Sequence, residues 1–187
     1  ATSTSTLQQK NAKHLIQSFS DLSYINNPEA THIISRADGV YIYDNDGKKI
    51  LDSMSGLWCV NMGYGQKSII DAVNEQMKEL VYYNNFFGSS HPSAIKLSEM
   101  IADKTPSGMN KVYFTGSGSE ANDTVVRLVR HYWAAKGKPS KSVIISRKNA
   151  YHGSTMAGAS LGGMSAMHAQ GGLPIPDIEH VDQPYYY

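Results

Sequence analysis

The sequence contains a single cysteine, Cys59, among its 187 residues. One cysteine excludes an intrachain disulfide framework and a zinc site built from several cysteines, and it fits the reducing environment of the cytoplasm. An excess of charge is also lacking, because 17 basic side chains stand against 16 acidic ones. Charge therefore gives no indication that nucleic acid or an anionic membrane surface is a partner.

Long hydrophobic runs are absent as well. The apolar runs fall far below the roughly 20 residues that cross a bilayer, and the polar start, residues 1–6, has no apolar signal-peptide stretch. We therefore expect a soluble, cytoplasmic protein with no membrane partner. At about 150 residues per domain, the length predicts one domain, with room for an appended segment. The hydrophobic content of 41% argues against disorder.

The first half of the chain predicts helices around a small β ribbon. The polar start is expected to fray up to about Leu7, where a short helix to about Ser18 begins. Residues 39–52 read as a hairpin, with Asp46-Gly47 supplying the positive φ of a tight turn. Apolar residues at helical spacing predict two further helices, over residues 68–80 and 93–104.

The second half alternates strands and helices. Short β-branched runs predict strands at residues 111–115, 142–146 and 178–181, and a helix is expected from Ala121 to about Ala135. The strands begin roughly 30 residues or more apart, which is the size of a βαβ unit. This pattern predicts a parallel sheet covered by helices on both faces, with ligands beyond the carboxyl ends of its strands.

A glycine loop, Gly116-Ser117-Gly118-Ser119-Glu120-Ala121, lies between the first of these strands and the helix. Backbone N–H groups, the helix dipole and the two serine hydroxyls would converge there, so a phosphate is the expected guest. The loop also matches the dinucleotide pattern G-x-G-x-x-A. That reading lacks the acidic residue after the next strand, where Arg147 and Lys148 stand. A turn selected only for close packing is the third interpretation.

Two other clusters have both a functional and a packing interpretation. Tyr151 and His152 follow the second strand and should face the same crevice as the glycine loop, which suggests a flat phosphorylated cofactor. Taken alone, Tyr151 would be interpreted as a half-buried packing residue and His152 as a turn residue hydrogen-bonded to the backbone. The aromatics around Trp58 and at residues 82–87 can line a pocket or fill a core, and Cys59 beside Trp58 is expected to be buried. The histidines lack metal-ligand spacing, and no serine-histidine-aspartate constellation stands out.

Three segments in order, residues 51–61, 114–124 and 149–155, resemble the class III aminotransferases, which are fold type I enzymes dependent on pyridoxal 5′-phosphate (PLP). The resemblance runs from about Phe19 to the end of the chain. It implies an α/β fold: a three-layer α/β/α large domain, of which only the first half is present, and an N-terminal α+β segment. Gly56-Leu57-Trp58 and Phe86-Phe87 resemble the ω-transaminase branch, which uses pyruvate as acceptor.

The resemblance implies roles for individual residues. Ser117, Gly118 and Ser119 match the loop that binds the cofactor phosphate. Tyr151 matches the aromatic ring that stacks on the pyridine, flanked by His152 and Gly153. The implied substrate pocket comprises Phe19, Leu57, Trp58, Phe86, Ser89 and Ser154.

The family contributes the segment around Phe86 to Ser89 from a partner subunit, which implies a homodimer or larger homo-oligomer with a shared active site. Some relatives have an arginine near position 89 that meets a substrate carboxylate. Here Ser89 stands there, which favours amines or diamines without a carboxylate.

The lysine that holds PLP as a Schiff base, and the aspartate that faces the pyridine nitrogen, lie downstream of the phosphate loop in this family. No lysine of this sequence stands in that context. We therefore expect the N-terminal part of a longer enzyme, inactive by itself and with no catalytic residue of its own. Residues 1–60 would belong to the small domain and residues 61–187 to the first half of the PLP-binding domain.

The resulting hypothesis is an aminotransferase that moves an amino group from an amine, diamine or ω-amino acid to pyruvate by a ping-pong mechanism. Two alternatives stay open at this point. One is an NAD(P)-binding oxidoreductase, which rests on the glycine loop alone, with Arg147 and Lys148 placed to suit a 2′-phosphate. The other is a non-catalytic fragment.

Overall fold

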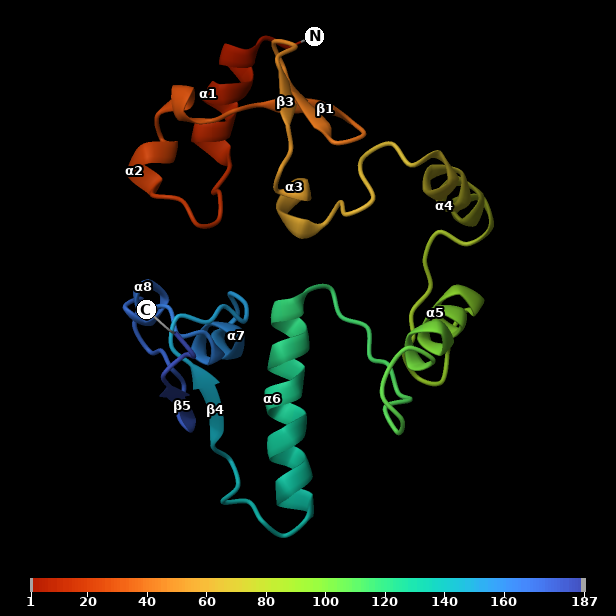
Figure 1. The fold of residues 1–187 in the computed structure, drawn as a ribbon, viewed down its shortest axis with the longest axis vertical. Coiled ribbons are helices and arrows are strands. Elements are labelled where there is room, and N and C mark those ends of the chain that lie inside the picture. Colours follow the sequence, from red (N-terminus) through yellow and green to blue (C-terminus); the bar gives the residue numbers. More distant parts are fainter. Residues whose placement is uncertain (1, 186–187) are drawn as a thin grey trace. The chain divides into compact units, whose positions relative to one another are not determined.

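The computed structural model describes residues 2–185. These residues form two compact units, one through Ser90 and one from His91 onward, and each is described by itself (Figure 1). The division after Ser90 reflects contacts within this chain. The domain boundary expected after residue 60 concerns the complete enzyme and stays a prediction.

The first unit begins with α1 (Thr4–His14), and the predicted fraying of the start up to Leu7 is wrong. The Ser3 hydroxyl caps this helix by accepting a hydrogen bond from the Thr6 backbone N–H at 3.3 Å. The Thr4 hydroxyl also donates to the Asp46 carboxylate at 2.5 Å. The first contact caps the helix and the second ties its start to the hairpin turn, which explains why the helix begins earlier than the polar sequence suggests.

A three-stranded antiparallel sheet follows, in the order β1 (Ile34–Asp38), β2 (Tyr41–Asp44) and β3 (Lys49–Leu51). The predicted hairpin is confirmed as β2 and β3, and Gly47 has the expected positive φ of 87°. Strand β1 was not predicted. It pairs with β2 so that Arg36 is opposite Tyr43, and the guanidinium lies 3.5 Å from the ring centroid.

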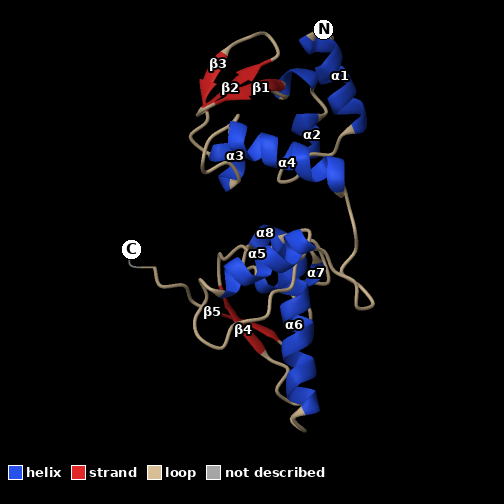
Figure 2. Cartoon of the chain, turned by 90° about the vertical axis from the view of Figure 1, so that its right-hand side faces the viewer, coloured by secondary structure: helices blue, strands red, loops and turns tan. Residues whose placement is uncertain are grey.

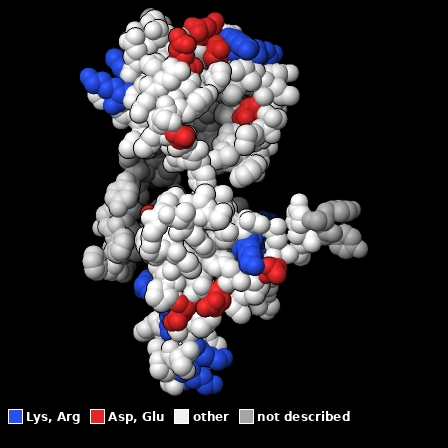
Figure 3. Space-filling view, turned by 90° about the vertical axis from the view of Figure 1, so that its left-hand side faces the viewer, with Lys and Arg blue, Asp and Glu red and all other residues white. Residues whose placement is uncertain are grey.

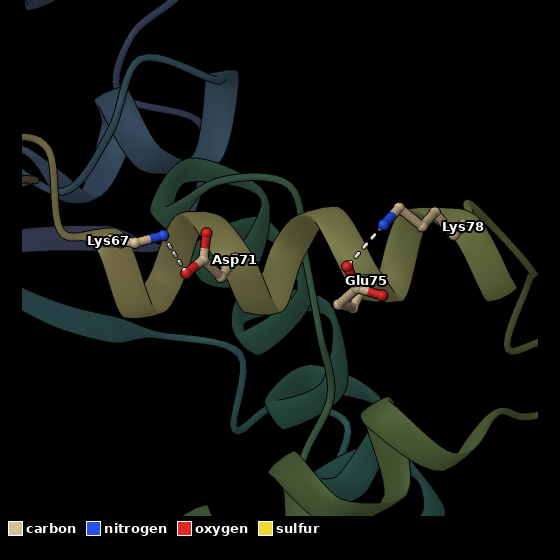
Figure 4. A network of polar contacts seen from close by, with 4 residues as sticks. All are labelled: Lys67, Asp71, Glu75 and Lys78. Atoms are coloured by element: carbon tan, nitrogen blue, oxygen red, sulfur yellow. Dashed lines mark hydrogen bonds and ion pairs between the residues drawn. The ribbon is translucent and has the colours of Figure 1, made fainter.

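The helices of the first unit are mostly short. They are α2 (Leu22–Ile25), the 3₁₀ helix η1 (Pro28–Ala30), α3 (Ser55–Trp58) and the longer α4 (Lys67–Glu79). The helix predicted over residues 68–80 is confirmed as α4. Two exposed ion pairs, Lys67–Asp71 and Lys78–Glu75, both 2.7 Å, lie on its polar face (Figure 4). Its apolar side chains, including Ile69, Val73 and Met77, are half exposed.

The second unit comprises α5 (Pro92–Ala102), α6 (Gly118–Ala135), β4 (Ile144–Arg147), α7 (Met156–Leu161), α8 (Ser165–His168) and β5 (Ile178–Val181). Strands β4 and β5 pair in parallel, as predicted, with Ile144 opposite Ile178. The strand predicted over residues 111–115 is wrong, since these residues are assigned to no strand. A strand needs a ladder partner, and no neighbouring strand pairs with them within residues 2–185.

The core of the second unit is formed by side chains of α6, α7, α8 and β5 (Figure 2). Its buried apolar side chains are Val126, Ala157, Ala159, Met167 and Ile178. The Ser160 hydroxyl is fully buried among them, and it donates to the Met156 carbonyl at 2.6 Å and accepts from the Ile175 N–H at 2.9 Å. Small residues let α7 approach closely, and satisfied polar atoms keep this core stable.

Two surface properties agree with the sequence. Within residues 2–185, no helix has the length and apolar character required to cross a bilayer. On the face drawn in Figure 3, basic and acidic side chains occur in small groups of both signs.

Candidate functional site

The glycine loop ends in a capped helix N-terminus. Ser117 is the N-cap of α6, and its hydroxyl accepts a hydrogen bond from the Glu120 N–H at 3.1 Å. The Glu120 carboxylate in turn accepts from the Gly116 N–H at 2.7 Å. This arrangement is close to a capping box, and it begins α6 before Ala121, where the sequence pattern placed the start.

The capping contacts leave particular donors for a ligand. Glu120 and Ala121 donate their N–H groups to Ser117, whereas the N–H groups of Gly118 and Ser119 have no protein acceptor in the described part of the chain. A Cβ atom built at Gly118 would meet no atom within 4 Å, so the space beside it is open. Free N–H groups at the positive end of an 18-residue helix suit an anion with several oxygen atoms. The donor set therefore fits a phosphate group.

The loop that follows β4 is held directly on the start of α6. The Ser154 N–H donates to the Ser119 hydroxyl oxygen at 3.1 Å, and the Asn122 side-chain amide donates to the His152 carbonyl at 2.6 Å. Because the Ser119 oxygen accepts from Ser154, its own proton is left to donate toward a ligand. The structure thus brings the predicted Ser117 to Ser119 group and the predicted His152 to Ser154 group together.

Asp123 completes this junction from the next position of α6. Its carboxylate oxygen Oδ1 accepts from the Thr155 hydroxyl at 2.6 Å and from the Gly158 N–H at 3.0 Å. Thr155 is also the N-cap of α7. One carboxylate therefore fixes the start of α7 relative to α6, and with it the loop that carries Tyr151.

Gly153 is the point of closest approach between the two loops. Its φ is +125°, and a Cβ atom there would lie 2.5 Å from the Ser119 hydroxyl oxygen and 2.9 Å from the Ser119 Cα. No side chain fits at this position without moving the backbone of α6. Glycine is therefore required here both by conformation and by contact.

Tyr151 and His152 lie beside this junction with exposed side chains. The Tyr151 ring is 54% exposed, so it is not the core tyrosine that packing alone would produce. An aromatic face next to a helix N-terminus can stack on a planar ring whose phosphate is held by that N-terminus. The stacking role of Tyr151 stays a prediction.

In the first unit, the segment around Trp58 has an unusual backbone. Four consecutive residues, 55–58, have positive φ values between 49° and 66°, so α3 is a left-handed turn. A left-handed helical conformation costs roughly 1–2 kcal/mol for each residue other than glycine. Backbone hydrogen bonds close the turn, including Trp58 N–H to the Met54 carbonyl at 2.8 Å. The turn leaves Leu57 and Trp58 60% and 75% exposed.

Asp52 supports this turn through its side chain. Its Oδ2 accepts from the Gly56 N–H and from the Tyr64 hydroxyl, both at 2.7 Å, and its Oδ1 accepts from the Met54 N–H at 3.2 Å. The hydrogen bond from Tyr64 is the main cause that lowers the pKa of the Asp52 carboxyl below its ordinary value. The same contact raises the pKa of the Tyr64 phenol.

The direction of these shifts predicts a pH dependence. Because the pKa of Asp52 is lowered on folding, its contribution to stability is present above about pH 4, the ordinary pKa, and is lost as the pH falls through the lowered value. We expect denaturant unfolding of wild type and Asp52→Asn to differ more at pH 6 than at pH 3. Tyr64→Phe, which removes the main cause, should shrink the pH dependence of that difference. An equal difference at both pH values would contradict this assignment.

The other predicted pocket residues lie on separate segments of the first unit. Phe19 has a positive φ of 54° and is 69% exposed, and Phe86 is 65% exposed. The Ser89 N–H donates to the Phe86 carbonyl at 2.9 Å, so these two residues share one turn. Cys59 was expected to be buried and is exposed, because the left-handed turn carries it to the surface. The roles of these residues in a pocket stay predictions.

Sequence reasoning overlooked four residues that support the candidate segments: Asn122 and Asp123 hold the loop junction of the second unit, and Asp52 and Tyr64 hold the turn of the first unit. The first two adjoin the glycine motif on the first turns of α6, and Asp52 precedes the Ser53-Met54-Ser55-Gly56 run. An aspartate before such a run is a signal for side-chain capping of a turn. The hydrogen bond from Tyr64 to Asp52 joins residues 12 positions apart in the sequence, so no local motif predicts it. Among the residues described, no cluster of His, Cys, Asp and Glu could hold a metal ion.

Comparison with protein families gives a match over most of the chain. The family model described as aminotransferase class-III matches residues 24–187. A putrescine–pyruvate aminotransferase of Pseudomonas aeruginosa is 58% identical over 174 residues, which cover 93% of this chain and 38% of that protein. A gamma aminobutyrate transaminase of Solanum lycopersicum is 46% identical, over 83% of this chain and 34% of the relative. The chain thus spans little more than a third of these curated relatives.

Solved structures agree. A transaminase structure from work on ancestral reconstruction superimposes with a TM-score of 0.95 and 40% identity, over all of this chain and 41% of that chain. The omega transaminase of Pseudomonas jessenii in complex with PMP superimposes with a TM-score of 0.92 and 38% identity, over 96% and 39% of the two chains. These matches confirm the predicted fold type I class, of which this chain forms a fragment.

Proposed function

This chain belongs to the class III aminotransferase family, and on that premise we propose that it supplies the phosphate-binding and ring-stacking part of an amine–pyruvate transaminase. The observation that carries the proposal is the junction at Ser119, where the Ser154 N–H holds the loop after β4, which includes the exposed Tyr151, against the start of α6. The similarity to a putrescine–pyruvate aminotransferase favours a diamine as donor and pyruvate as acceptor. The family match selects this function over the dinucleotide reading of the glycine loop.

We propose PLP as the cofactor. In bound form PLP acts as an electron sink that stabilises negative charge on the substrate carbon. The residues of this chain would hold it: the Gly118 and Ser119 N–H groups and the serine hydroxyls would bind its phosphate, and Tyr151 would stack on its ring. His152 and Gly153 would shape the loop between them. The complex of the similar Pseudomonas jessenii enzyme with PMP supports this assignment.

The substrate pocket is a proposal as well. The family resemblance assigns to it Phe19, Leu57, Trp58, Phe86, Ser89 and Ser154. Their large aromatic rings are exposed within this chain, which is the state expected of side chains that meet a substrate or another subunit. The family resemblance implies a homodimer in which the segment from Phe86 to Ser89 completes the partner's pocket, and the exposure of Phe86 and Phe87 is compatible with it. The serine at position 89 favours a donor without a carboxylate near that point.

The direct test uses the full-length protein that carries this chain. Added PLP should give a visible absorbance band that an amine such as putrescine removes and pyruvate restores. The absence of both the band and any amine-dependent change would overturn the proposed function. Tight NADP binding measured by calorimetry, without PLP binding, would establish the oxidoreductase alternative instead.

The stacking role of Tyr151 makes a smaller prediction. Tyr151→Ala should weaken PLP retention by roughly fivefold to tenfold, because an aromatic contact of this kind contributes about 1 kcal/mol beyond its area. Equilibrium dialysis of the full-length protein against PLP measures this change. Tyr151→Phe keeps the ring and should retain PLP nearly as well as wild type. Equal affinity for wild type and Tyr151→Ala would show that the ring only packs.

A further inference from the structure

The left-handed turn at residues 55–58 is fixed by its backbone and not by its side chains. None of its side chains is buried, and Leu57 and Trp58 are the most exposed of them. A side chain that is not packed in place takes its direction from the backbone that carries it. The residues that hold the turn therefore also set the direction of the Cα–Cβ bonds of Leu57 and Trp58.

Asp52 and Tyr64 hold the turn from two sides. Asp52 follows β3 and binds the turn through the Gly56 and Met54 N–H groups. Tyr64 is fixed to the sheet by a backbone bridge with Gly39, with N···O distances of 2.7 and 3.2 Å. Its hydroxyl then reaches the same carboxylate oxygen as the Gly56 N–H. The two residues form a clamp between the sheet and the strained turn, which we call the Asp52–Tyr64 clamp.

The clamp leaves no room for a side chain at Gly56. A Cβ atom at Gly56 would lie 2.9 Å from the Tyr64 hydroxyl oxygen and 3.0 Å from Cγ2 of Val60. The phenol therefore packs against the bare backbone of the turn as well as donating to Asp52. A strained conformation persists only where its surroundings determine it fully, and such sites cluster where a ligand is bound.

We propose that Asp52 and Tyr64 are positioning residues that set which amines the enzyme accepts, by fixing the direction of Leu57 and Trp58. This inference rests on the proposed function, because it takes Leu57 and Trp58 as walls of the substrate pocket. Neither Asp52 nor Tyr64 touches the substrate. Loosening the clamp lets the turn relax toward a less strained backbone, which moves the indole and changes the room available to a bulky donor.

The test compares two amines in the full-length, PLP-loaded enzyme with pyruvate as acceptor. The ratio of kcat/KM for 1-phenylethylamine to kcat/KM for propylamine measures the size limit. For Tyr64→Phe and Asp52→Asn we expect this ratio to change by about fivefold to tenfold, the effect of losing one hydrogen bond that positions a wall. Most of the change should be in KM, and the PLP absorbance band should be retained. Tyr24→Phe and Asp71→Asn, on exposed positions of the same unit, are matched controls and should keep the wild-type ratio.

A double-variant cycle shows whether the clamp acts through Trp58. If it does, Tyr64→Phe should no longer change the ratio in a Trp58→Gly background, because the side chain being positioned is gone. A ratio within twofold of wild type for both clamp variants, or the same effect with and without Trp58, would overturn the proposal. Failure of the proposed function is separate, since wild type would then fail to turn over putrescine with pyruvate as well as both test amines.

Discussion

Replacing Gly153 with alanine should separate the two loops of the candidate cofactor site. The new Cβ atom would fall 2.5 Å from the Ser119 hydroxyl oxygen and 2.9 Å from the Ser119 Cα, and the φ of +125° is one that alanine rarely adopts. Overpacking against a helix backbone, with the added conformational strain, should cost about 3 kcal/mol of unfolding free energy. PLP retention should fall by more than about tenfold, because the displaced loop carries the Tyr151 ring.

The matched control for this substitution is Gly171→Ala. Gly171 also has a positive φ, of 86°, but a Cβ atom there would meet nothing within 4 Å. The substitution Gly171→Ala should therefore lower the free energy of unfolding only by the cost of a positive φ for alanine, about 1 kcal/mol, and leave PLP retention unchanged. Denaturant unfolding and PLP dialysis of the full-length protein measure both quantities. If the two variants behaved alike, the close contact of Gly153 with Ser119 would not be important.

Replacing Asp123 with alanine should have the second large effect. The Thr155 hydroxyl and the Gly158 N–H, both partly buried, would lose their common acceptor. Each donor would keep only a long contact, Thr155 with the Ser119 carbonyl and Gly158 with the Thr155 hydroxyl, both at 3.4 Å. Losing the carboxylate should cost about 2 kcal/mol of unfolding free energy and weaken the attachment of α7 to α6. We expect faster hydrogen exchange at the start of α7 and a loss of PLP retention of about tenfold.

Two variants separate the charge of Asp123 from its geometry. Asp123→Asn keeps one acceptor oxygen and the side-chain size, and it should lose less than half as much stability as Asp123→Ala. Thr155→Ser keeps the hydroxyl donor and should resemble wild type. Wild-type exchange rates at α7 in Asp123→Ala would contradict the role given to this carboxylate.

The glycine loop shows how far sequence reasoning reached at the cofactor site. The run from Gly116 to Ala121 predicted an anion site at a helix start, because glycines and serines there expose N–H and O–H donors. The helix start is confirmed, and the anion site stays a prediction. The adjacency of Tyr151 to this loop was also inferred, from the rule that parallel strands end at one edge. The structure places them together by a different route. Residues 111–115 form no strand. The loops are joined directly by hydrogen bonds that Ser119 and Asp123 accept and one that Asn122 donates.

The Trp58 segment marks the opposite limit. Its sequence suggested only an aromatic pocket or core, and nothing in it predicted a left-handed turn. Glycine accounts for one of its four positive φ values, whereas the other three are unfavourable by local preference. They persist because Asp52 and Tyr64 bind the turn from outside it.

By itself, the sequence determined the elements with strong local patterns. They include the hairpin turn at Gly47, the amphipathic helices α4 and α6, and the family resemblance carried by three ordered motifs. Local patterns suffice there because glycine φ preference, apolar periodicity and helix capping act over a few neighbouring residues. Tertiary structure alone decided the ordered start of α1, the docking of the 152–158 loop on α6 and the left-handed turn before Cys59. Each depends on a hydrogen bond between residues distant in sequence, which stabilises a conformation that local preferences do not favour.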